Sequence, residues 1–111
     1  PLWLAPVQAT VIPIADRHLD YANEVRDALL ARDLRVEVDA GGDRMGAKIR
    51  KAQLQKVPYM LVVGDREAEA NTVSLRHRAL GDLGATPLVD AVVRIAGERD
   101  AKSLDPDPET E

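Results

Sequence analysis

The chain has 111 residues, a formal net charge of −4, 45% apolar residues and no cysteine. This length suits one domain with one core, and the absence of cysteine excludes disulfides and thiolate metal sites. No apolar run is long enough to cross a bilayer and the first residues lack the order of a signal peptide, so we expect a cytoplasmic protein. The abrupt start at Pro1-Leu2-Trp3, without an initiator methionine, indicates a piece of a longer chain.

Two strands and an intervening helix are predicted first. Residues 7–14 form an apolar run rich in β-branched side chains, which is typical of a buried strand. Residues 18–32 place aliphatic side chains at helical spacing, and Asp33, which tolerates a left-handed backbone, is expected to end that helix. Residues 34–39 alternate apolar and polar side chains and predict a strand covered on one face.

A second helix is predicted after a turn at the glycine pair 41–42. It is expected to run over residues 43–55, with Met45, Ile49 and Ala52 as its buried stripe.

The last third of the domain is predicted to contain two strands and a helix. Residues 57–64 are the most apolar segment and suit a central strand, and residues 71–78 alternate in polarity. The short connection 65–70 predicts a hairpin, so these strands are expected to be antiparallel. Thr86-Pro87 is typical of a helix start, and the acidic residues 103–111 are expected to be disordered.

This order of elements predicts an α/β fold, a three-layer sandwich with helices on both faces of the sheet. Two right-handed crossovers give three parallel strands, and the hairpin adds an antiparallel one. We detect no internal repeat or second domain, so residues 1–102 are expected to form one domain and residues 103–111 an acidic tail.

Candidate catalytic and metal-binding residues are few. His18 and His77 have no cysteine partner and are predicted to be solvated, and Ser74 and Ser103 are the only serines, so we expect neither a nucleophilic triad nor a metal site. Neither the GxGxxG pattern nor the GxxxxGK[ST] pattern is present.

Two classes without RNA specificity stay open. Asp16, Asp39 and Asp65 follow predicted parallel strands, where α/β sheets often bind ligands, so a receiver-like signalling domain that binds Mg²⁺ or accepts phosphate is one alternative. Turns after strands also favour aspartate for local hydrogen bonds. A protein-interaction module is the other alternative.

The net charge hides a basic segment. Residues 98–111 account for the whole net charge, whereas residues 44–56 hold five basic residues and no acid. Arg44, Lys48 and Lys51 fall on one helix face, which favours contact with nucleic acid but is also typical of a solvated face.

Glu67, Arg76 and Arg78 flank the predicted hairpin. Guanidinium groups bind phosphate or guanine edges, whereas a carboxylate accepts from base N–H groups, so this mixture favours the reading of unpaired RNA bases. Cross-strand pairing of Glu67 with Arg76 is the alternative.

Three segments carry a family resemblance: PLWLAPVQ at the start, KIRKAQLQKVPYMLVVGDRE in the middle, and VSLRHR. Over residues 1 to about 100 they resemble the C-terminal anticodon-binding domain of bacterial threonyl-tRNA synthetase, a class II aminoacyl-tRNA synthetase. The resemblance implies a mixed, mostly parallel five-stranded sheet with three main helices. The additional short strand is expected near residues 78–83.

The resemblance also implies an anticodon-binding site. Its candidate residues are Gly42, Asp43, Arg44, Lys48, Arg50, Glu67, Arg76 and Arg78. Recognition is expected to concentrate on the G and U shared by threonine anticodons, and which residue meets which base stays open. Lys48 and Arg50 are expected either to hold phosphate or to brace the helix.

The glycine pair departs from the family pattern. Many members carry Arg-Asn at positions 41–42, where the asparagine contacts a base, and Gly42 has no side chain to do so. Either backbone groups or Asp43 and Arg44 replace this contact, or the domain binds the anticodon less tightly. Arg44 retains the charge of a family lysine.

The remaining expectations follow from the resemblance. The fragment is expected to perform no chemistry, and its parent is expected to be a threonine-tRNA ligase. ATP, Mg²⁺ and zinc are expected only in absent domains of the parent. The expected partners are the threonine tRNA anticodon stem-loop and the parent's catalytic domain, with the parent a homodimer, the fragment a monomer and no membrane involved.

Overall fold

A computed structural model describes residues 7–104. The strands are β1 (Ala9–Pro13), β2 (Val36–Val38), β3 (Tyr59–Val63), β4 (Thr72–His77) and β5 (Gly81–Pro87). The helices are the 3-10 helix η2 (Asp16–His18), α1 (Leu19–Leu30), α2 (Met45–Leu54), α3 (Asp65–Ala70) and α4 (Leu88–Leu104). Within these residues, no helix is both long and apolar enough to span a membrane.

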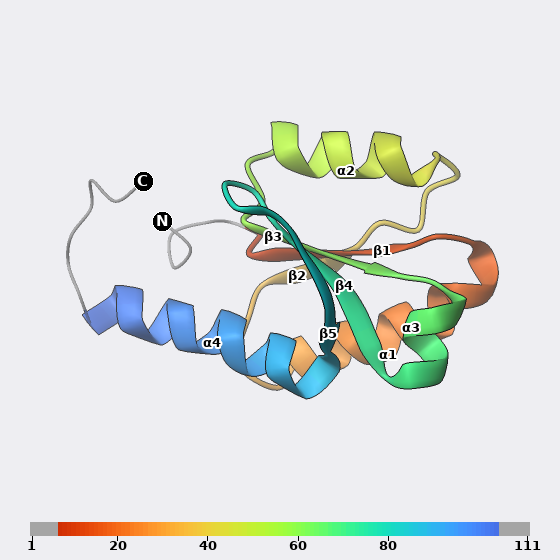
Figure 1. The fold of residues 1–111 in the computed structure, drawn as a ribbon. Helices are drawn as coiled ribbons and strands as arrows, with labels where there is room; N and C mark the ends of the chain where they lie inside the picture. The colour runs from red at the N-terminus through yellow and green to blue at the C-terminus, as the bar shows by residue number, and fades with distance from the viewer. Residues whose placement is uncertain (1–6, 105–111) are drawn as a thin grey trace.

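The strands form one mixed sheet in the order β2-β1-β3-β4-β5 (Figure 1). β1 pairs in parallel with both β2 and β3, whereas β4 is antiparallel to β3 and to β5. The structure confirms the predicted α/β class, the three parallel strands and the antiparallel fourth strand.

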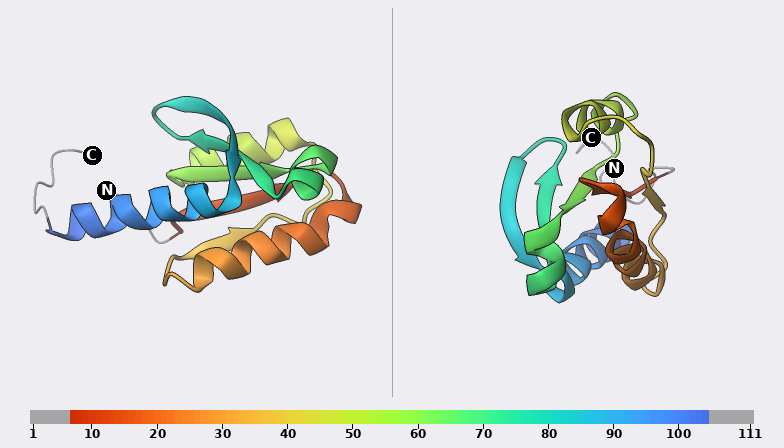
Figure 2. Two further views of the ribbon diagram at one scale, coloured as in Figure 1. Left: turned by 60° about the horizontal axis from the view of Figure 1, so that its bottom comes forward. Right: turned by 90° about the vertical axis from the view of Figure 1, so that its right-hand side faces the viewer.

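Helices cover both faces of the sheet, as predicted (Figure 2). α1 and α4 lie on one face and α2 on the other, because the crossovers from β1 to β2 and from β2 to β3 pass on opposite sides. The positive φ of 61° at Asp33 just after α1 confirms the expected left-handed backbone there.

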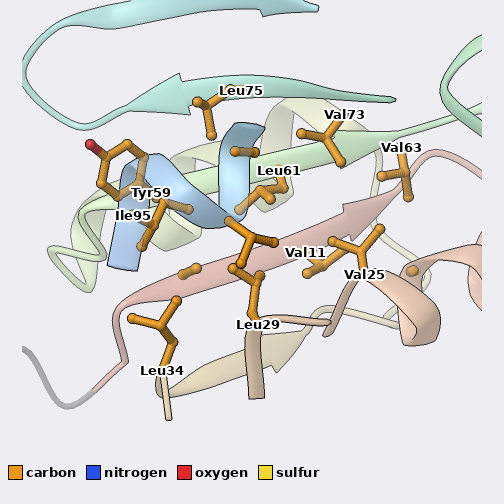
Figure 3. Close-up of a cluster of buried hydrophobic side chains, with 14 of the residues drawn as sticks. Val11, Val25, Leu29, Leu34, Tyr59, Leu61, Val63, Val73, Leu75 and Ile95 are labelled. Atoms are coloured by element: carbon orange, nitrogen blue, oxygen red, sulfur yellow. The ribbon is translucent and has the colours of Figure 1, made fainter. Parts of the chain in front are cut away.

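The larger apolar core lies between the sheet and the α1/α4 layer (Figure 3). Its largest side chains come from the sheet, from α1 and α4 and from the loop before β2, and include Val11, Val25, Leu29, Leu34, Tyr59, Leu61, Leu75 and Ile95. A smaller core lies under α2 and consists of Ile12, Ala52, Val57, Met60 and Val62, with Val7 and Ile49 packed against it. α2 packs over β1 and β3, which contribute to the smaller core. On the same face of the sheet, it therefore leaves β4 and β5 uncovered.

Two predicted elements differ from the structure. The connection 65–70 is the helix α3 rather than a simple turn, because it begins after Gly64, contains good helix formers and ends at Asn71 in the left-handed conformation with φ of 60°. The fifth strand spans Gly81–Pro87 instead of residues 78–83. Gly81 and Gly84 both have positive φ, which lets the chain turn and bend along this edge strand.

Helix boundaries and burial also differ in detail. Thr86 and Pro87 end β5 and α4 begins one residue later, which is consistent with proline at the end of an edge strand. Met45, predicted to be buried, is 40% exposed because it starts α2 beyond the edge of the smaller core. Residues 103 and 104, predicted to begin the disordered acidic tail, belong to α4, and the rest of the tail lies outside the described residues.

Candidate nucleic-acid interface

A pocket of about 270 Å³ opens at the carboxyl ends of the parallel strands. One wall is the chain after β1, from Pro13 to Asp16, and the opposite wall is the loop 40–43 after β2. Leu19 and Lys48 complete the lining. Open α/β sheets bind ligands at this edge, because the loops that follow successive strands converge there.

The loop 40–43 presents backbone groups more than side chains. The N–H of Gly41 donates to Oδ1 of Asp39 at 3.1 Å, which closes a local turn. Gly42 faces open space, because a Cβ built there meets no atom within 4 Å. Asp43 and Arg44 are exposed, so both predicted site residues are accessible beside the pocket.

Lys48 braces the pocket instead of belonging to an exposed basic stripe. Its side chain is only 5% exposed, and its Nζ donates to the carbonyl oxygens of Pro13 at 3.3 Å and Asp39 at 3.1 Å. The predicted basic face of α2 therefore divides, with Lys48 turned inward while Arg44 and Lys51 stay exposed. Arg50 is also exposed, on the outer surface of the helix.

Glu67 lies in the first turn of α3, not on a strand. Its Oε1 accepts a hydrogen bond from the N–H of Gly64 at 2.8 Å, which caps a backbone donor at the start of the helix. The other carboxylate oxygen can still accept from a bound base.

Arg76 is the next-to-last residue of β4, on the α2 face, opposite Met60 of β3. Its Nη1 lies 3.8 Å from Oδ2 of Asp82 on β5, and within residues 7–104 its buried Nε has no hydrogen-bond partner. The alternative of a Glu67–Arg76 ion pair is therefore wrong in this structure. The guanidinium, with its side chain 32% exposed, is a donor on the uncovered part of the sheet.

The three hairpin residues do not form one compact cluster. Met60, opposite Arg76, precedes Gly64 by four residues, or about 13 Å along β3. Arg78 follows β4 at its other end, where its N–H donates to the carbonyl of Pro58, and its side chain is exposed. Glu67 and Arg78 thus lie at opposite ends of the β3/β4 pair, with Arg76 between them.

An ion-pair network unforeseen from the sequence joins η2 to the first residue of α3, next to the pocket. Asp65 accepts from Nε of Arg17 at 3.1 Å, from Nη2 of Arg17 at 2.9 Å, and from Nε2 of His18 at 2.6 Å. These hydrogen bonds from Arg17, followed by that from His18, hold the pKa of Asp65 well below its usual range. No sequence signal links residues almost 50 positions apart, so this network could not have been found from spacing.

The predicted solvation of the histidines is wrong. His18 is 4% exposed, and His77 is partly buried with its ring packed edge-on against Tyr59 at a centroid distance of 4.9 Å. Among residues 7–104, no group of three or more histidine and carboxylate side chains is arranged to hold a metal ion.

Comparison with known proteins defines the class. The family model described as "Anticodon binding domain" matches residues 8–98. The chain therefore belongs to the anticodon binding domain family.

Two similar relatives are both named as threonine-tRNA ligases. The chain is 51% identical over 104 residues to the threonine-tRNA ligase of Caldanaerobacter subterraneus subsp. tengcongensis and 50% identical over 105 residues to that of Symbiobacterium thermophilum. These alignments cover 94% and 95% of this chain but 16% of each relative.

A solved structure shows the same fold. The RNA binding domain of threonyl-tRNA synthetase from Cryptosporidium parvum Iowa II is 32% identical, with a TM-score of 0.81. The match covers 87% of this chain and 24% of that chain.

Proposed function

We propose that this chain is the anticodon-binding domain of a threonyl-tRNA synthetase and that it binds the anticodon loop of threonine tRNA. The family match and the identity of about one half to threonine-tRNA ligases support this assignment. The structural observation that carries it is the guanidinium of Arg76: within residues 7–104, its buried Nε has no hydrogen-bond partner and none of the described helices covers its part of the sheet. A donor in this state favours a ligand with acceptor atoms, such as a guanine edge or a phosphate.

The proposed contact surface runs from the pocket edge onto β4. Gly42 and Asp43 line the pocket and Arg44 follows them in the chain. Glu67 lies at the start of α3, and Arg76 lies farther along the sheet. Unpaired bases splayed from an RNA loop can reach acceptors and donors that are spread from the pocket edge to Arg76, whereas a single small ligand cannot.

Aminoacylation is proposed to take place in the remainder of a longer parent enzyme. The chain spans 16% of the length of its relatives, so the ATP, Mg²⁺ and zinc sites of such an enzyme are proposed to lie outside it. The catalytic domain of the parent is the proposed intramolecular partner, and the cytoplasm is the proposed location.

Replacing Arg76 by alanine tests the assignment. We expect Arg76→Ala to weaken binding of a threonine anticodon stem-loop by about 1–3 kcal/mol, or about 5- to 150-fold, at fixed salt. Arg26→Ala is the matched control, because Arg26 is similarly exposed (36% against 32%) and also has an acidic neighbour, but it lies on α1 across the sheet. Fluorescence anisotropy gives both affinities.

Two outcomes would contradict the proposal. One is equal affinity of Arg76→Ala and Arg26→Ala for the stem-loop. The other is wild-type binding that does not change when the G and U shared by threonine anticodons are both replaced.

A further inference from the structure

We propose that Asp65 and His18 are positioning residues for RNA binding, which act by locking two walls of the anticodon surface together without touching the RNA. The inference rests on the proposed function. It concerns the segment 14–18, whose first three residues line the pocket, and the segment 64–67, which carries Glu67.

Several contacts join these two segments. The N–H of Ile14 donates to the carbonyl of Val63 at 2.9 Å, and the side chain of Ile14 lies against Gly64, where an added Cβ would come within 2.6 Å of Ile14 Cδ1. Asp65 then accepts three hydrogen bonds from the opposite segment, two from Arg17 and one from His18. A two-point guanidinium contact fixes orientation as well as distance.

The hydrogen bonds of His18 determine which of its ring nitrogens carries the proton. The N–H of Ala15 donates to Nδ1 of His18 at 3.1 Å, so Nδ1 must be the unprotonated nitrogen. Nε2 therefore carries the proton and donates it to Asp65 at 2.6 Å. Through these two hydrogen bonds, the side chain of His18 connects the turn after β1 to the first residue of α3. The ring is only 4% exposed, so its surroundings hold it in this orientation.

The consequence for RNA is geometric. Asp65 and Glu67 lie in the same short turn, and Oε1 of Glu67 is already bound to the N–H of Gly64. Loss of the Asp65 contacts would let α3 and the pocket wall move apart, so Glu67 and the loop 40–43 would no longer face the RNA at a fixed separation.

For the replacement of Asp65 by asparagine, charge alone predicts tighter RNA binding, whereas the positioning role predicts weaker binding. Removing a carboxylate raises the net charge by one unit, and this should tighten RNA binding slightly. We expect Asp65→Asn to weaken binding of the threonine stem-loop by roughly 2- to 30-fold instead. Asp27→Asn is the matched control, because Asp27 is similarly exposed and pairs with an arginine, Arg26, on α1.

A pair of neutral variants separates positioning from stability. His18→Gln places an amide donor near the position of Nε2 and should keep the affinity within about twofold of wild type, whereas His18→Asn can satisfy Ala15 but cannot reach Asp65 and should weaken binding as Asp65→Asn does. Affinities are compared under conditions in which circular dichroism shows every variant folded. If Asp65→Asn does not fold, the histidine pair decides.

The possible results distinguish the two proposals. Wild-type binding together with equal affinities for Asp65→Asn and Asp27→Asn, or equal affinities for the two His18 variants, overturns the positioning role and leaves the proposed function intact. A wild-type domain that does not prefer the threonine stem-loop overturns both.

Discussion

Individual residues show where sequence patterns are informative and where they are not. Asp33 follows α1 with a left-handed backbone, which its residue type indicates directly. His18 is predicted to be solvated, and Lys48 is expected either to hold phosphate or to brace the helix, yet both side chains are buried. Their partners come from segments 9 to 47 positions away, and no local pattern contains that information.

Gly42 offers a residue-scale prediction for affinity. A Cβ at this position meets no atom within 4 Å and the backbone is not left-handed, so Gly42→Asn should fold normally. We expect it to strengthen binding of the threonine stem-loop by about 2- to 12-fold, the effect of one added hydrogen bond of about 0.5–1.5 kcal/mol. Gly42→Ala is the control, and equal affinities of the two variants would show that the backbone or Asp43 and Arg44 already supply the contact.

Tyr59 gives a prediction for alkaline pH. Burial, together with the hydrogen bond to Glu98 at 2.5 Å, raises the pKa of Tyr59 to about 12, from about 10 in an unfolded chain. The neutral phenol therefore favours the folded state; this stabilisation is complete below pH 10 and is lost as the pH rises toward 12. Urea unfolding between pH 9 and 12 should show a steeper loss of stability for wild type than for Tyr59→Phe.

Burial also raises the pKa of Tyr21, so this residue provides the comparison. Tyr21→Phe should keep most of the wild-type pH dependence because Tyr59 is still present. Identical slopes for wild type and Tyr59→Phe would contradict the assignment to Tyr59.

At the scale of elements, segments with a clear apolar pattern were predicted well, and α3, which has none, was not. The strands β1 and β3 and the helix α1 each carry enough apolar side chains for their pattern to indicate type and position. α3 has six residues, none of them buried, so no apolar pattern reveals it. The Gly64-x-x-Glu67 spacing and Asn71 were available signals for its ends.

The attachment of α2 gives an element-scale prediction. Lys48→Met would leave the carbonyls of Pro13 and Asp39 without their shared donor, and we expect the free energy of unfolding to fall by about 1–3 kcal/mol. Lys51→Met, an exposed change of the same type one turn away, should alter it by less than about 0.5 kcal/mol. Urea unfolding measures both, and equal midpoints would contradict the bracing role of Lys48.

At the scale of the whole molecule, the order of elements was sufficient to predict the sheet but not its exposed surface. Two crossovers and a hairpin determine three parallel strands and an antiparallel neighbour. Which strands α2 covers depends on side-chain packing over β1 and β3, and that packing leaves Arg76 uncovered. The candidate site residues were thus predicted one by one from the sequence, while their separation along the sheet required the structure.

The direction of the parallel strands places the pocket and the end of α4 at opposite ends of the molecule, so labels at the two ends can locate bound RNA. β1 enters the sheet at the end where α4 finishes, and the pocket loops emerge at the far end of a molecule about 41 Å long (Figure 1). A fluorophore attached to the last turn of α4 would sit remote from bound RNA, whereas one on the loop after β2 would sit beside it. Energy transfer from these two points to a labelled stem-loop would therefore report which end of the domain the nucleic acid occupies.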